Sequence, residues 1–257
     1  MNKVNSEVAL GIAFYENGDI DKAVQHYRRA VAIDSSCAEA HAGLGIALAR
    51  LDNRAEACNH LEKALKLTPD CGILANWLAD AFFDQGQFDR AIELYSEALR
   101  LDPCDNNAQN DMADAYRLKG DYATAVKMYD RAIEIDPGDT NAMLEKAQCL
   151  VQLHKPEEAF LVLQKLIERF PTSRDRATAM VVYGTLLQKA GKTAEAAKWF
   201  ENALEFFPFN HQVLWQAANS AHENGDRQRC AVYLQKIIDL NPADESAATM
   251  LRKVLNQ

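Results

Sequence analysis

Six of the seven prolines in this chain of 257 residues stand at a regular spacing. Pro69, Pro103, Pro137 and Pro171 are each 34 residues apart, Pro208 follows after 37 residues, and Pro242 after another 34. A fixed period of about 20 to 50 residues is typical of proteins in which one structural unit is stacked many times. Each unit of such a chain packs against its neighbours, and no central core is built. The spacing therefore predicts a solenoid, not one or two globular domains.

Glycines recur within this period where one helical pattern ends and the next begins. When the regularly spaced proline is counted as position thirty-two of the unit, position fifteen holds Gly18, Gly86, Gly120, Gly191 and Gly225. Glycine commonly follows the end of a helix because it adopts a positive φ without a steric penalty. Each unit is therefore predicted to be a helix, a turn, a second helix and a proline-marked turn. The abundance of alanine favours the same all-α class.

Small and large residues alternate at fixed positions of the unit. Position eight holds Gly11, Gly45, Ala79, Ala113, Ala147, Gly184 and Ala218, and position twenty holds alanine in six units and Cys230 in the seventh. Position twenty-four holds the large residues Tyr27, Leu61, Tyr95, Tyr129, Leu163, Phe200 and Leu234. Close-packed interiors are filled by placing large side chains against small ones. The pattern therefore predicts two tightly packed helices in each unit.

In these positions the chain resembles the tetratricopeptide repeat (TPR) family. The resemblance covers residues 4–242 as seven repeats, which begin near residues 4, 38, 72, 106, 140, 177 and 211. It implies an all-α fold, a right-handed superhelical α-solenoid of helix-turn-helix repeats. Ser35 replaces the proline in the first repeat, and three extra residues within 172–176 mark a possible seam. Residues 243–257 are predicted to form an amphipathic C-terminal capping helix that begins after Asp244.

Charge and cysteine content indicate the compartment and exclude some partners. The net charge is -9 and the chain has no run of basic residues, so we expect neither a nucleic acid nor a membrane as partner. The sequence shows no signal peptide and no stretch of 18 apolar residues. The six cysteines form no CxxC pair and are expected to be reduced thiols. These features together predict a cytoplasmic protein.

Residues that could carry chemistry are scattered and lack a catalytic pattern. No nucleophile, phosphate-binding or zinc-protease motif occurs, so we expect no enzyme activity and no cofactor. His26 and His60 share position twenty-three of neighbouring repeats, but neither has a second ligand four residues further on. A metal site is therefore not expected, and the histidines are interpreted as structural.

The inner surface of the array is the predicted binding surface, because solenoids bind partners through the concave face of successive helices. In each first helix that face is predicted to contain positions two, five, nine and twelve. Its polar part forms a predicted peptide-binding groove of Asn76, Asp80, Asn107, Asn110, Asp114, Arg117, Asn141 and Gln148.

Two pairs of residues in the groove suggest what it binds. Asn76 and Asn110 share one register in adjacent repeats, and an asparagine amide both donates and accepts hydrogen bonds. They are expected to hold the backbone of an extended peptide. Asp80 and Asp114 would then favour a basic side chain in that peptide. The alternative is that these side chains are simply solvated on a helix face.

Aromatic residues gather near the C-terminus and form a possible second interaction patch. They are Trp199, Phe206, Phe207, Phe209 and Trp215, of which most lie at or near an inter-repeat turn. Exposed aromatic residues are typical of protein interfaces. The alternative is that they only seal the turn.

The sequence therefore predicts a non-enzymatic adaptor that binds a peptide or a helix of a partner protein in its groove. A different interpretation is a scaffold protein that forms homo-oligomers through its first repeat and the C-terminal aromatic patch. A third, a regulatory fragment of an enzyme, requires a catalytic domain that this sequence does not contain.

Overall fold

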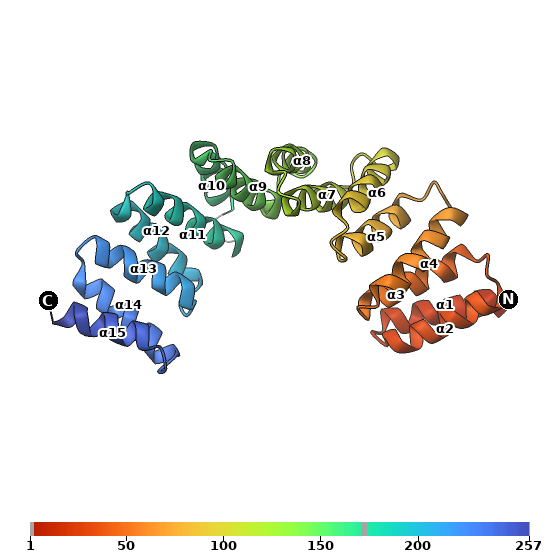
Figure 1. The fold of residues 1–257 in the computed structure, drawn as a ribbon, viewed down its shortest axis with the longest axis horizontal. Helices are drawn as coiled ribbons and strands as arrows, with labels where there is room; N and C mark the ends of the chain where they lie inside the picture. The colour runs from red at the N-terminus through yellow and green to blue at the C-terminus, as the bar shows by residue number, and fades with distance from the viewer. Residues whose placement is uncertain (1–2, 171–173, 257) are drawn as a thin grey trace. The chain divides into compact units, whose positions relative to one another are not determined.

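The computed structural model describes residues 3–170 and 174–256, which form fifteen helices and no strand (Figure 1). The first helices of the repeats are α1 (Lys3–Glu16), α3 (Ala38–Arg50), α5 (Gly72–Phe83), α7 (Asn106–Leu118), α9 (Thr140–Gln152), α11 (Arg174–Lys189) and α13 (His211–Glu223). The second helices are α2 (Ile20–Ile33), α4 (Arg54–Leu67), α6 (Phe88–Leu101), α8 (Tyr122–Ile135), α10 (Pro156–Arg169), α12 (Thr193–Phe206) and α14 (Arg227–Leu240). The predicted all-α, helical repeat fold is confirmed.

The chain divides into two compact units, Met1–Pro137 with α1 to α8 and Gly138–Gln257 with α9 onward. The seam expected at residues 172–176 stays a prediction, and residues 172 and 173 lie outside the described part of the chain. None of the described helices is both long enough and apolar enough to cross a bilayer.

Within each compact unit the first helices of neighbouring repeats contact one another, in addition to packing on the second helices. In the first unit α1 contacts α3, α3 contacts α5 and α5 contacts α7, and in the second unit α11 contacts both α9 and α13. Each second helix also contacts the next first helix of its unit, as α2 does with α3. Because the first helices approach one another as well, they lie on the inner side of each curved stack.

A last helix, α15 (Glu245–Leu255), packs on α14. Its apolar stripe buries Ala247 and Val254. The Asp244 carboxylate accepts a hydrogen bond from the Ala247 N–H at 3.0 Å, so Asp244 caps the N-terminus of this helix.

Position eight lies directly against position twenty-four in repeats one, two and six, where position eight is glycine. A Cβ atom added to Gly11 would stand 2.6 Å from the Tyr27 ring, and one added to Gly184 would stand 2.8 Å from the Phe200 ring. Neither side chain has room to retreat, because Tyr27 is 4% exposed and Phe200 is fully buried. The predicted packing of small against large residues is confirmed.

The turn inside each repeat requires a positive φ at position fifteen. The five glycines at this position have φ between 74° and 83°, as the sequence predicts. Repeats two and five have no glycine there, and Asp52 and His154 adopt φ of 61° and 58° instead. Non-glycine residues in this region are strained by about 1–2 kcal/mol, with Asp and His tolerated better than most.

Replacing His154 by glycine is expected to stabilise the protein by about 1 kcal/mol, because the strain at this turn is removed. Denaturant unfolding of the His154→Gly variant measures the effect. As a control, Lys165→Gly in the exposed interior of α10 is expected to destabilise by about 1 kcal/mol. If both variants lose stability, the strain at His154 is negligible.

Ion pairs recur between neighbouring second helices. They join position twenty-five of one repeat to position nineteen of the next, in Arg28–Glu56, Glu62–Arg90 and Glu201–Arg229. Exposed pairs of this kind contribute little to stability. Their recurrence at one register indicates that they help to set how adjacent repeats align.

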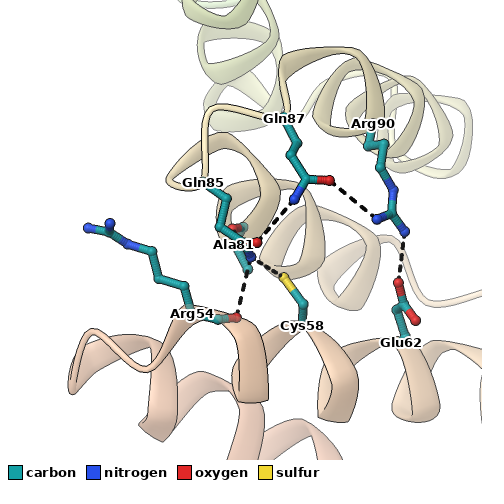
Figure 2. A network of polar contacts seen from close by, with 7 residues as sticks. All are labelled: Arg54, Cys58, Glu62, Ala81, Gln85, Gln87 and Arg90. Carbon is teal, nitrogen blue, oxygen red and sulfur yellow. Dashed lines mark hydrogen bonds and ion pairs between the residues drawn. The ribbon is translucent and has the colours of Figure 1, made fainter.

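Figure 2 shows the junction that contains one of these pairs, between α4 and the α5–α6 hairpin. Arg90 contacts Glu62 at 2.8 Å and Gln87 at 3.4 Å, and its guanidinium lies 3.8 Å from the centre of the Phe82 ring. The Gln85 amide nitrogen lies 2.9 Å from Cys58 Sγ on α4. This polar network therefore ties repeat three to repeat two.

Candidate functional site

The structure brings together the predicted groove residues of α5 and α7 in the first unit. Asn107 is exposed, and Asn76, Asp80, Asn110, Asp114 and Arg117 are half-buried. We call the surface formed by these residues together with Ile73, Trp77 and Asp111 the α5–α7 face. Helix α5 contacts α7 directly, so the side chains belong to one continuous surface on the inner side of the unit.

Two aspartates of this face are held by tyrosines from the second helices. The Tyr95 hydroxyl donates to Asp80 Oδ1 at 2.7 Å, and the Tyr129 hydroxyl donates to Asp114 Oδ1 at the same distance. Both rings are buried in the helix pair. Burial, then the neighbouring aspartate, raises the pKa of each tyrosine well above 10, so both remain donors. A tyrosine at position twenty-four therefore fills the core and also orients the carboxylate at position nine.

The two carboxylates differ in their ionic partners. Arg117 donates to Asp114 through Nε at 3.0 Å and Nη2 at 2.8 Å, so the positive charge expected from a ligand is supplied by the chain itself. Repeat three has Phe83 where repeat four has Arg117. Within the described residues no basic side chain lies at ion-pair distance from Asp80. Burial raises the pKa of Asp80, although its bond to Tyr95 lowers it.

Asp111 on α7 is a further acidic residue of this face that the sequence interpretation missed. It is half-buried, and burial followed by the charges of Asp80, Asp114 and Asp105 raises its pKa to about 7. It stands at position six, outside the stripe of positions two, five, nine and twelve. Its spacing of three residues from Asp114 on the same helix is the signal that could have identified it.

A buried polar atom without a hydrogen bond and two exposed apolar side chains lie on α5, next to these carboxylates. The Asn76 Oδ1 atom is buried and has no hydrogen-bond partner in the structure. Ile73 is 70% exposed and Trp77 is 36% exposed, one helical turn apart. The face therefore combines negative charge with exposed apolar surface.

Asn141 and Gln148 belong to α9 in the second unit. Asn141 is exposed, and the Gln148 amide donates to Glu145 at 3.1 Å. Gln148 lines a pocket of about 290 Å³ between α9, α11 and α13, together with Val181, Thr185 and Gln216 among others. This volume is at the lower limit of small-molecule sites, so the pocket has room for only a small group.

The structure separates the predicted aromatic patch. Trp199 packs on Tyr183, with ring centres 4.9 Å apart, in the core of α11 and α12. Trp215 packs in a different core, formed by α13, α14 and α15. Phe207 is half-buried, while Phe206 is 36% and Phe209 72% exposed. The exposed part of the patch therefore consists of Phe206 and Phe209.

The histidines have partners that the sequence interpretation did not identify. In repeats one and two, position twenty-three of the second helix contacts position four of the first helix. His26 lies 2.7 Å from Glu7, and His60 lies 2.8 Å from His41. Each pair is separated by 19 residues in sequence, so a search at that spacing could have found both. Among the described residues no group of three or more metal-ligating side chains occurs.

Comparisons with known proteins agree with this architecture. Models of the tetratricopeptide repeat match residues 45–106 and 116–181, and a model described as TPR repeat matches residues 11–52. A comparison with curated proteins gave no match to the chain. The chain belongs to the tetratricopeptide repeat family, whose members are protein-interaction modules.

Three solved structures are similar in fold. The C-terminal part of a TPR repeat-containing protein from Cytophaga hutchinsonii has a TM-score of 0.80 at 15% identity, over 94% of this chain and 98% of that one. MamA has a TM-score of 0.63 at 21% identity, over 66% and 92%. YrrB, described as a TPR protein with an unusual peptide-binding site, has a TM-score of 0.58 at 24% identity, over 75% and 97%.

Proposed function

We propose that this protein binds a peptide segment of a partner protein on the α5–α7 face, and that the segment places a basic side chain next to an apolar one. The observation that carries the proposal is the pair of half-buried carboxylates, Asp80 and Asp111, beside exposed Ile73 and Trp77. The peptide-binding site described for the similarly folded YrrB supports the same kind of role.

The energetics of the face favour a cation in the ligand. Burial disfavours the ionised forms of Asp80 and Asp111, and repulsion by Asp80 adds to this at Asp111. A lysine or arginine placed between them would offset that repulsion, and charge-assisted hydrogen bonds are about twice as strong as neutral ones. Asn76 and Asn110 lie one turn before Asp80 and Asp114, where their amides would bind the peptide backbone.

A positional-scanning library of synthetic dodecapeptides tests the proposal on the full chain. We expect lysine or arginine to be enriched at one position and a large apolar residue close to it. The double variant Asp80→Asn, Asp111→Asn should lose the basic preference, because both charges are removed while shape is kept. Asp21→Asn, at an exposed site on α2, serves as the control and should keep it. A library without basic enrichment would contradict the proposal.

A second candidate function is self-assembly into homo-oligomers. Leu10 and Ile12 on α1 are 42% and 46% exposed, and Phe209 is 72% exposed in the second unit. Contiguous exposed apolar surface is typical of association sites. Sedimentation over a range of concentrations tests it, and a monomer at every concentration would remove this candidate.

A further inference from the structure

Two histidines of repeat two form a pair that the α5–α7 face does not use. His41 on α3 and His60 on α4 approach each other with 2.8 Å between their Nδ1 atoms, and their ring centres are 5.0 Å apart. His41 is 1% exposed, and His60 is half-buried. At the same two positions repeat five has the apolar residues Met143 and Val162. Repeat five therefore has two apolar residues at these positions, whereas repeat two has two titratable ones.

The hydrogen bonds fix where the protons lie in this pair. His41 Nε2 lies 3.2 Å from the Ser35 carbonyl oxygen, which only accepts, so His41 carries its proton on Nε2. The Nδ1 atom of neutral His41 is then an acceptor, and His60 donates to it from its own Nδ1. The Nε2 atom of His60 is left unprotonated, 3.9 Å from a Glu56 carboxylate oxygen.

Each proton added to the neutral pair binds less favourably than the one before. The first can bind to His60 Nε2, but a second must bind to His41 Nδ1 and would face the N–H of His60. The charged groups that act on His60 are His41 on α3, Lys63 and Glu56 on α4, and Arg28 on α2. Burial comes first, and with His41, Lys63 and Arg28 it lowers the pKa of His60, whereas Glu56 raises it. Glu7 on α1 is bonded to His26, the histidine at the position of His60 in repeat one.

The pair also holds the turn between repeats one and two. Ser35 lies between α2 and α3, at the place where the later repeats have proline, and its carbonyl is bound by His41. We propose that the His41–His60 pair is a proton-sensitive joint, and that its protonation opens the end of the array formed by repeats one and two. This inference is independent of the ligand proposed for the α5–α7 face.

The direction of the pH dependence follows from the proton balance. In the opened state the His60 imidazole has an ordinary pKa of about 6.5. In the closed state burial and the contact with His41 lower the pKa of His60, so the opened state takes up a proton as the pH falls below about 6.5. Each proton taken up favours opening by about tenfold per pH unit until the closed state is protonated as well.

Hydrogen exchange of the full chain, measured by mass spectrometry at pH 7.5, 6.5 and 5.5, tests the joint. After correction for intrinsic exchange rates, protection of α3 and α4 should fall about tenfold between pH 6.5 and 5.5. Protection of α12 and α14 in the second unit is the internal reference and should stay constant. Unchanged protection of α3 and α4 would overturn the proposal.

Variants distinguish the pH response of the His41–His60 pair from that of other histidines. The double variant His41→Met, His60→Val introduces the residues of repeat five, and its pH response should disappear. His211→Gln removes an exposed histidine that pairs with Asp244 in the second unit, and the wild-type response should remain. If the double variant does not fold, imidazole nitrogen NMR of the wild type decides. A His41 ring protonated on Nδ1 at pH 7.5 would refute the proposed proton arrangement.

Discussion

Replacing Phe200 by alanine is expected to lower the free energy of unfolding by about 3–5 kcal/mol, the range found when a buried phenylalanine is truncated. Phe200 has no exposed surface, and its ring lies against Gly184, which has no side chain to fill the space. The cavity would therefore persist between α11 and α12. Denaturant unfolding followed by circular dichroism measures the loss.

Phe209→Ala is the matched control for this prediction. It removes the same side chain from the same repeat region, but Phe209 is 72% exposed, so the change should stay within about 0.5 kcal/mol. In a repeat array each unit interacts with its neighbours only. Hydrogen exchange in α1 to α6 should therefore be unaffected by Phe200→Ala. A small effect of Phe200→Ala would show that the register places the wrong residue in the core.

A lysine-containing peptide selected on the α5–α7 face is expected to bind about tenfold more weakly at pH 6 than at pH 8. The pKa of Asp111 is about 7 in the free protein, so its carboxylate is protonated as the pH falls below that value. A bound cation favours the ionised carboxylate and lowers that pKa. Binding therefore releases a proton below pH 7, and affinity falls by up to tenfold per pH unit there. Isothermal titration calorimetry measures the affinities.

Asp111→Asn should abolish this pH dependence, because asparagine keeps the shape of the side chain and does not titrate. Asp114→Asn is a less suitable test, since it would also release Arg117 from its ion pair. The position in the fold also separates this effect from the histidine joint, because His41 and His60 lie on α3 and α4 and Asp111 lies on α7. The same affinity at pH 6 and pH 8 in the wild type would contradict the role given to Asp111.

The recurring positions of the repeat could be interpreted from the sequence because each reports a local constraint. A positive φ at position fifteen depends on the turn alone, and five glycines marked it. The contact between positions eight and twenty-four depends on two helices joined by a short turn, and the small and large residues alternate accordingly. The same register also encodes the pairs 19 and 28 residues apart, such as His41–His60 and Glu62–Arg90. A search at those spacings would have found them.

The candidate site could be predicted only in part from the sequence. The sequence pattern predicts that Asp80 and Asp114 lie on one face, and it does not distinguish between them. The structure distinguishes them, because Arg117 neutralises one and Phe83 leaves the other without a cation. The predicted aromatic patch differs from the structure in another way. Trp199 and Trp215 are close in sequence, but they pack into different cores.

The sequence by itself determined the repeat, its helices and the packing of each helix pair, because these depend on residues within one period of each other. Only the tertiary structure decided which polar side chains lose solvent and which charges meet. The raised pKa of Asp111 results from burial and from carboxylates on two helices of different repeats. The proton arrangement of His41 and His60 depends on a carbonyl in the preceding turn. Such effects depend on distances of a few ångströms between separate elements, and no periodicity in the sequence reports those distances.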